Sequence, residues 1–251
     1  MIASTRAVET IPALGHDTAM DLADAEYDRL LAVVDDLRGD DWARQTDCPA
    51  WDVNAMLGHV LGMLELQADV DERMRQIRAA AEVSARSGGL RLDALTALQV
   101  REHERLQPEQ VRRALHEATP RGLAARRAMT AEQLAAPYDP LLPGEATWTF
   151  GYLFDVVHTR DPWIHRVDIC RAIGRDVVLS SEHDGMIVAD VVADWARRHG
   201  QPFTLTLGGP AGGSFRAGSG GADLELDAVE FCRILSGRES GAGLLATRVV
   251  F

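Results

Sequence analysis

The sequence predicts a mainly α protein, in which a helical bundle is followed by a small α/β (α+β) domain. Three observations support this fold class. Apolar residues recur at helical spacing through most of the chain before Gly174, and glycine and proline residues separate the periodic segments. After Gly174, apolar residues and threonines alternate at a period of two over residues 203–207, which is typical of a strand. We therefore expect two domains, residues 1–176 and residues 177–251.

Cap and stop residues bound the helices expected in the first domain. The first helix covers residues 17–38 and ends near Gly39. Asp52 is a suitable N-cap for a second helix that runs to about Arg86, before Gly88-Gly89. Pro108 suits the first position of a later helix. The other helices are expected over residues 91–106, 108–128 and 150–173, with a loop at residues 137–143.

Two features of these helices concern their surfaces. Gly58 and Gly62 flank His59, and each costs about 1 kcal/mol relative to alanine inside a helix. Small residues there allow the close approach of either a neighbouring helix or a ligand. Four arginines of the 108–128 helix are expected to form a solvated face; they are Arg112, Arg113, Arg126 and Arg127.

The second domain has a different residue pattern, with predicted strands as well as helices. A helix is expected over residues 181–198, a strand over residues 203–207, and a hairpin or flexible loop in the glycine- and serine-rich stretch that ends at Gly221. This stretch lacks the strand–GxxxxGK–helix order of a phosphate-binding loop. Residues 224–226 suit a strand, residues 228–235 a helix that closes at Gly237, and residues 247–251 a further β-like segment.

Composition excludes several classes of function. The chain has 251 residues, of which 46% are hydrophobic and 25% charged, and its net charge is −12. This charge argues against nucleic acid or an anionic membrane as a partner. Neither a membrane-spanning apolar run nor a secretory signal is present, and the odd number of well-separated cysteines indicates reduced thiols. We therefore expect a cytoplasmic protein, a monomer or a homodimer.

The basic residues are unusual, because all 26 of them are arginine. The absence of lysine excludes Schiff-base chemistry and a lysine general base. Arginine-only usage together with abundant alanine and glycine is also typical of a GC-rich genome, such as that of an actinobacterium.

The segment from His158 to Asp168 is the most informative part of the chain. His158, Asp161, His165 and Asp168 are spaced by three, four and three residues, so an α-helix places all four side chains along one face. Two imidazoles and two carboxylates suit a divalent metal ion. Pro162 removes the N–H that would bond the carbonyl of residue 158, so a kink is expected there.

A metal site at this face needs a ligand from a second helix, and His59 is the best candidate. Each residue also has an alternative interpretation. His59 on an apolar helix can be a hydrogen-bonded core histidine, His158 can lie at the surface, and Asp161 before Pro162 can simply be a helix N-cap. A role of Asp161 as a helix cap does not explain why His165 and Asp168 lie on the same helix face.

Two motifs resemble a known family. Asp47-Cys48-Pro49-Ala50-Trp51-Asp52-Val53, followed by Met56-Leu57-Gly58-His59-Val60, is similar to the N-terminal signature of the mycothiol-dependent maleylpyruvate isomerases. Residues 159–168, Thr-Arg-Asp-Pro-Trp-Ile-His-Arg-Val-Asp, resemble the second metal motif of that family. The C-terminal segment from Phe231 to Arg238 also fits, so the resemblance covers nearly the whole chain.

The resemblance implies a DinB-like four-helix bundle and a C-terminal domain similar to sterol-carrier proteins. It implies that His59, Asp161 and His165 bind the metal ion; family members often have glutamate where Asp161 stands. His158 is kept as a reserve ligand. Three such ligands leave an open position on zinc, at which mycothiol, the thiol of actinobacteria, binds as a thiolate.

The resemblance thus implies an enzyme in which mycothiol adds to a small electrophile, with isomerisation or S-transfer as the outcome. A metal-dependent hydrolase that uses bound water and a non-catalytic binding protein are the alternatives.

Arg238, or else Arg233, is expected to clamp a substrate carboxylate, unless both belong to a solvated helix face. Asp168 either orients an imidazole or an arginine, or pairs with Arg171 at the surface. None of the cysteines, Cys48, Cys170 and Cys232, is expected to act as a nucleophile.

Overall fold

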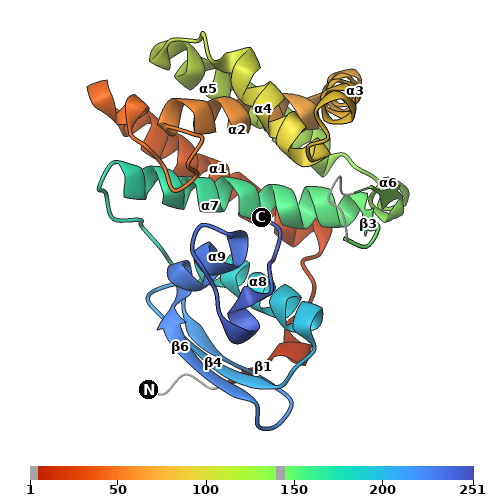
Figure 1. Ribbon diagram of the computed structural model, residues 1–251, viewed down its shortest axis with the longest axis vertical. Coiled ribbons are helices and arrows are strands. Elements are labelled where there is room, and N and C mark those ends of the chain that lie inside the picture. The colour runs from red at the N-terminus through yellow and green to blue at the C-terminus, as the bar shows by residue number, and fades with distance from the viewer. Residues whose placement is uncertain (1–4, 140–144) are drawn as a thin grey trace. The chain divides into compact units, whose positions relative to one another are not determined.

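The computed structural model describes residues 5–139 and 145–251, and the chain divides into two units (Figure 1). The helical unit comprises His16–Asp176. The sheet unit combines residues 5–15 with Val177–Phe251. The sequence analysis assigned residues 1–176 to one domain, whereas the structure includes the strand at Arg6–Ala7 in the sheet of the C-terminal unit. Most of the loop expected at residues 137–143 lies outside the described residues.

The helical unit is built around four long helices, α1, α2, α5 and α7. Helix α1 packs against α5 and α7, α2 packs against α5, and α4 and α3 add a further layer on α2 (Figure 1). The helices are α1 (His16–Asp36), α2 (Val53–Ala68), α3 (Val70–Ser87), α4 (Arg91–His103), α5 (Pro108–Arg127), α6 (Ala131–Ala135) and α7 (His158–Ala172). Short elements connect them: η2 (Gly39–Ala43), the hairpin β2 (Pro137–Tyr138) and β3 (Trp148–Thr149), and the π-helical segment η3 (Tyr152–Val157).

The core of the helical unit consists of apolar side chains from the facing sides of α1, α2 and α5. Leu30, Leu57, Leu61 and Leu115 are almost completely buried in it, as is Ile169 of α7. These residues recur at the helical spacing noted in the sequence, so burial of one apolar stripe per helix holds the bundle together.

One expected helix is in fact two. The sequence analysis predicted a single helix from about Val53 to Arg86, and this prediction was wrong, because the chain turns at Asp69. Its carboxylate accepts hydrogen bonds from the backbone N–H groups of Asp71 and Glu72, at 2.8 and 3.1 Å, and so caps α3. The predicted N-cap of α2 is confirmed, since Asp52 accepts from the Ala55 N–H at 2.8 Å.

The glycines of α2 lie where α4 crosses it. A Cβ atom built at Gly62 would be 2.6 Å from Cγ of Gln99, and one at Gly58 would be 3.2 Å from Cβ of His103. A neighbouring helix therefore occupies the space that these glycines leave open. We expect Gly62→Ala to destabilise the fold by about 1 kcal/mol or more, since overpacking of about 1–3 kcal/mol exceeds the gain in helix propensity.

Urea denaturation measures this change, and Gly58→Ala, with its longer contact, serves as the matched control with a smaller loss. Equal stability of Gly62→Ala and the unsubstituted protein would contradict the packing argument.

The sheet unit contains a four-stranded sheet in the order β1-β5-β4-β6. Strands β4 (Phe203–Gly208) and β5 (Gly213–Ala217) are antiparallel, whereas β6 (Ala222–Asp227) runs parallel to β4 and β1 (Arg6–Ala7) runs parallel to β5. Helices α8 (Asp184–His199) and α9 (Ala228–Ser236) lie on one face of this sheet (Figure 1). The short helices η1 (Val8–Thr10) and η4 (Gly243–Ala246) complete the unit.

Strand β4 confirms the predicted alternation, because Phe203, Leu205 and Leu207 are buried and the residues between them are exposed. Part of the glycine-rich stretch forms the second strand of a hairpin with β4. The β-like ending was predicted wrongly, since residues 247–251 form no strand and the Val249 N–H bonds the carbonyl of Leu235. The predicted fold class, mainly α with a small α/β region, is confirmed. Within the described residues, no helix is long and apolar enough to span a membrane.

Candidate metal centre

The helix that carries the candidate ligands begins after a π-helical segment. Pro162 lies inside α7, which continues from His158 to Ala172, and η3 precedes it. Proline has no N–H to bond the carbonyl of His158. Arg126 of α5 supplies that donor: its Nη1 bonds the His158 carbonyl at 3.2 Å, and its Nη2 bonds the carbonyl of Phe154 and, at 3.0 Å, Oγ1 of Thr159. The start of α7 is thus held by a side chain from another helix.

The position of Arg126 corrects the expectation of a solvated arginine face. The residue is completely buried. Burial, opposed by nearby Tyr27 and Asp155, lowers the pKa of Arg126 to about 10, so it stays protonated at neutral pH. Arg126 follows Gly122 by four residues, and Gly122 belongs to the buried side of α5. This spacing was the sequence signal for a buried arginine.

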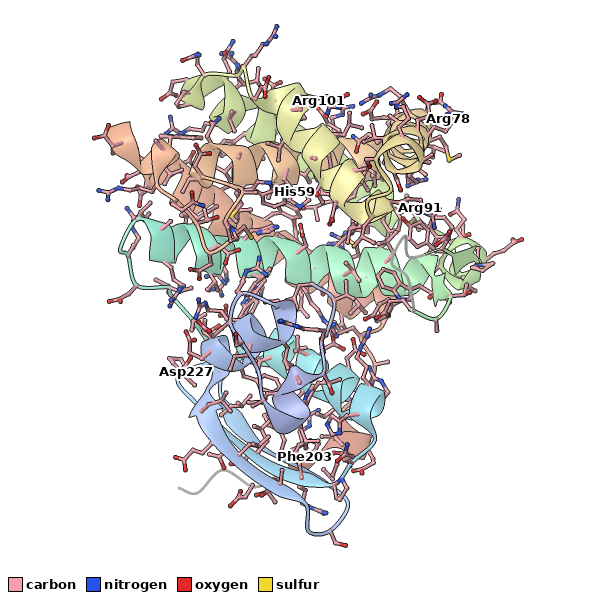
Figure 2. All side chains as sticks on the ribbon, viewed as in Figure 1. His59, Arg78, Arg91, Arg101, Phe203 and Asp227 are labelled. Atoms are coloured by element: carbon pink, nitrogen blue, oxygen red, sulfur yellow. The ribbon has the colours of Figure 1, made fainter. Side chains whose placement is uncertain are left out.

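Three candidate ligands meet between α2 and α7. Nε2 of His59 is 3.5 Å from Oδ1 of Asp161, and Nε2 of His165 is 3.2 Å from the same oxygen. One ligand atom from each residue lies within 4.8 Å of the other two. Both imidazoles are buried and Asp161 is half-buried. Figure 2 labels His59 on α2, on the side that faces α7.

The charge on Asp161 is set by this arrangement. Burial acts to raise the pKa of the Asp161 carboxyl, but the imidazoles of His165 and His59 outweigh it and hold the pKa well below its usual range. Asp161 is therefore an anion between two nitrogen donors. It lies within α7 and is not the N-cap of that helix.

Each imidazole is oriented through its other nitrogen. Nδ1 of His59 lies 2.8 Å from Oε1 of Gln99, and Nδ1 of His165 lies 3.2 Å from Oδ2 of Asp168. Because both partners are acceptor oxygens, each Nδ1–H is held in a hydrogen bond, and each Nε2 is directed at Asp161. Asp168 is completely buried, and Arg171 instead pairs with Asp47 at 2.9 Å.

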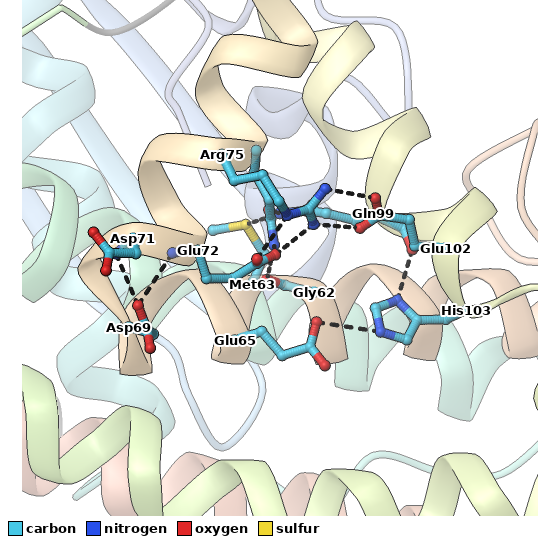
Figure 3. Close-up of polar contacts among 11 residues, drawn as sticks. Gly62, Met63, Glu65, Asp69, Asp71, Glu72, Arg75, Gln99, Glu102 and His103 are labelled. Carbon is cyan, nitrogen blue, oxygen red and sulfur yellow. Dashed lines mark hydrogen bonds and ion pairs between the residues drawn. The ribbon is translucent and has the colours of Figure 1, made fainter.

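A chain of buried amides continues outward from His59, and Figure 3 shows its outer part, with Gln99, Gly62 and Glu72 labelled. Nε2 of Gln99 donates to Oε1 of Gln76 at 2.9 Å, which leaves Oε1 of Gln99 to face His59. Nε2 of Gln76 in turn donates to the Gly62 carbonyl at 3.1 Å and to Glu72 at 2.8 Å. Sequence reasoning missed both glutamines, although Gln99 stands beside Leu95 and Leu98 in the buried stripe of α4. A glutamine in an apolar stripe was the available signal.

Trp51 covers one side of the cluster. Its ring centroid is 4.9 Å from that of His59, with an interplanar angle of 32°, and 6.0 Å from that of His165. The loop before α2 holds it, because the Trp51 carbonyl accepts from the N–H and, at 2.7 Å, the hydroxyl of Thr46. The sequence analysis quoted Trp51 within the first family motif but assigned it no role.

The reserve ligand His158 lies outside the group of three ligand atoms. Its ring packs edge-on against Phe154 at 4.8 Å, and its buried Nδ1 has no hydrogen-bond partner among the described residues. Burial, followed by repulsion from Arg126, lowers the pKa of His158 to about 3, so the imidazole is neutral at pH 7.

This neutral histidine predicts a pH dependence of stability for the metal-free protein. Unfolded His158 takes up a proton near pH 6.5 and folded His158 only near pH 3, so its contribution to stability is present above pH 6.5 and is lost as the pH falls toward 3. The expected slope from this residue is about 1.4 kcal/mol per pH unit. Urea denaturation between neutral and mildly acidic pH measures it, and His158→Gln should show a shallower slope. Parallel slopes for the two proteins would contradict the prediction.

The remaining candidates are placed as follows. Arg233 of α9 is buried and pairs with Glu230 at 2.6 Å. Arg238 follows Gly237, which ends α9 with φ of 93°, and is half-buried. Cys48 is partly exposed, whereas Cys170 and Cys232 are buried, and the three form no disulfide. Burial raises the pKa of the Cys170 thiol, which opposes thiolate formation.

The fold and this cluster define a helical-bundle protein with a candidate divalent-metal centre between facing helices. The sequence profile of the mycothiol maleylpyruvate isomerase N-terminal domain matches residues 23–170, more than half of the chain, so the chain belongs to this family. The family resemblance noted in the sequence is thereby confirmed.

Two solved structures have the same fold. One is the mycothiol-dependent maleylpyruvate isomerase, with a TM-score of 0.58, 15% identity, and coverage of 95% of this chain and 94% of the other. The second is a histidine-to-alanine mutant of that isomerase, with a TM-score of 0.60, 14% identity, and coverage of 94% and 93%. Among curated proteins, no sequence matches this chain.

Proposed function

We propose that this protein is a divalent-metal-dependent enzyme that activates mycothiol as a thiolate for addition to an electrophilic small molecule. The reaction is isomerisation or S-transfer of the maleylpyruvate isomerase type, in the cytoplasm. The observation that carries the proposal is the convergence of one ligand atom each from His59, Asp161 and His165 within 4.8 Å. Family membership and the names of the structural relatives support mycothiol as the thiol.

The donor set fits a metal ion such as zinc. Ligand atoms about 2.0–2.2 Å from a tetrahedral zinc ion lie about 3.3–3.6 Å from one another. The observed separations from the Asp161 oxygen, 3.5 Å to His59 and 3.2 Å to His165, are close to that range. Two imidazoles and one carboxylate are also the ligand types of catalytic zinc sites, which keep a fourth position open.

A divalent ion in this position would supply positive charge that favours the thiolate form of a bound thiol. The surrounding residues prepare the site for it. Gln99 and Asp168 accept hydrogen bonds from Nδ1 of His59 and His165, which leaves each Nε2 as the nitrogen that would bind the ion. Trp51 packs beside both rings. No cysteine is needed as a nucleophile in this scheme, and Cys48→Ala should retain activity.

The deciding experiment combines metal analysis with a thiol-dependence assay. Protein purified without chelator should contain about one equivalent of zinc or a similar divalent ion. With mycothiol present, it should consume maleylpyruvate or conjugate 1-chloro-2,4-dinitrobenzene. Absence of bound metal would support a non-catalytic binding protein instead, and turnover that does not need mycothiol would support a metal-dependent hydrolase.

Arg238 is our proposed clamp for a substrate carboxylate, because arginine binds carboxylates through two parallel hydrogen bonds and the chain has no lysine. Arg238→Lys keeps the charge but loses the planar guanidinium group that can form two parallel hydrogen bonds. We therefore expect turnover of maleylpyruvate to fall about tenfold or more with unchanged metal content. Arg233→Lys tests the alternative residue, and Arg216→Lys on strand β5 is the control. Full turnover by Arg238→Lys would show that Arg238 has no such role.

A further inference from the structure

The helical unit contains a cavity that lies away from the histidine cluster. Its volume is about 330 Å³, and it lies at the C-terminal end of α2, beside the first turn of α3 and the last turn of α5. Gln67, which lines it, follows His59 by eight residues, or about 12 Å along a helix axis. The cavity is therefore separate from the candidate metal centre. We refer to it as the Arg73 pocket.

Arg73 is the charged residue of this pocket. Its guanidinium carbon lies 5.2 Å from the ring centroid of Phe154, and the side chain forms no hydrogen bond or ion pair with any described residue. Its neighbours differ: Arg75 binds Glu72 and Glu102, and Arg91 binds Asp139. Burial lowers the pKa of Arg73, which reflects the cost of a partly desolvated cation. An anion in the pocket would offset that cost.

Apart from Gln67 and Gln133, the other lining residues are apolar. Ala125, Ala128 and Met129 come from the end of α5 and the residues that follow it, and Phe150 contributes an aromatic ring. The Phe150 ring stacks with Phe154, on which Arg73 lies, at a centroid distance of 6.0 Å. Such walls suit an apolar or aromatic body beside a single anionic group.

We propose that the Arg73 pocket binds a small carboxylic acid that carries an apolar or aromatic body. The carboxylate binds the guanidinium of Arg73, and the body packs against Met129 and Phe150. The site does not depend on a metal ion, so it stands or falls separately from the proposed function.

N-acetyl-L-phenylalanine has a carboxylate and an aromatic body, and its C-terminal amide differs from it only in lacking the charge. Isothermal titration of the full-length protein should give saturable one-to-one binding of the acid, with the amide at least about tenfold weaker. Equal affinity for acid and amide, or no saturable binding of the acid, would overturn the proposal.

Variants locate the binding. Arg73→Gln should weaken binding of the acid about tenfold or more, whereas Arg78→Gln, an exposed arginine of the same helix (Figure 2), should not change it. Ala125→Leu fills the cavity and should block the acid while Arg73 is intact, which guards against a folding defect in a single variant. His59→Ala should leave this affinity unchanged. Loss of binding in His59→Ala, with full binding in Arg73→Gln, would assign the acid to the histidine cluster and refute the pocket.

Discussion

Asp161→Asn should remove metal binding and, with it, turnover. The carboxylate lies between His59 and His165 and is held as an anion by both imidazoles, whereas an amide of the same shape has no charge to offer a cation. We expect metal affinity to fall by more than about 100-fold, because substitutions outside the ligand set already cause losses of 10–100-fold. Equilibrium dialysis with zinc measures the affinity, and circular dichroism checks the fold.

Asp155→Asn is the matched control for this change. Asp155 is another buried carboxylate, two helical turns or less before Asp161, but it pairs with His16 at 2.8 Å and lies outside the ligand group. It should retain full metal content. If Asp161→Asn bound zinc as tightly as the control, the cluster would be a structural hydrogen-bond group and not a metal site.

Gln99→Leu should weaken metal binding about 10–100-fold, the range observed for residues that orient a metal-binding histidine. Leucine has no acceptor for the Nδ1 proton of His59, so the ring loses the contact that directs its Nε2 toward Asp161. The substitution also leaves Oε1 of Gln76 without its donor. Zinc affinity is the direct readout, and turnover at saturating zinc should recover most of its value.

Gln99→Glu separates orientation from packing. A carboxylate at this position still accepts from Nδ1 of His59, although it no longer donates to Gln76. We therefore expect Gln99→Glu to keep zinc affinity close to that of the unsubstituted protein. Equal losses in both variants would indicate that Gln99 matters only for the packing of α4 on α2.

The sequence was most informative wherever a single helix carries the relation between residues. The spacing of Asp161, His165 and Asp168 placed them on one face, and the structure has all three on one helix, with Asp168 against His165. The backbone geometry of an α-helix determines such relations without reference to the rest of the fold. Caps are similarly local, which explains why Asp52 was identified correctly.

Contacts between helices were harder to predict. Arg126 was expected at the surface, but it binds the His158 carbonyl, which Pro162 leaves without a donor, and the Phe154 carbonyl of the π-helical segment. Neither the turn nor its distance from α5 can be recognised from residue spacing. Asp69 was missed for a related reason, since apolar periodicity continues on both sides of the cap that separates α2 from α3.

The sequence by itself therefore determined the fold class, the exclusion of lysine chemistry and the candidate ligands, with the family motif linking His59 to the second helix. Only the tertiary structure decided which side chains surround those ligands. Gln99 and Gln76 come from α4 and α3, and their hydrogen bonds depend on how closely α4 approaches Gly62. The Arg73 pocket is likewise formed where α2, α3, the end of α5, α6 and Phe150 meet. Local spacing is set by covalent geometry, whereas these contacts depend on how apolar faces pack, which no single segment encodes.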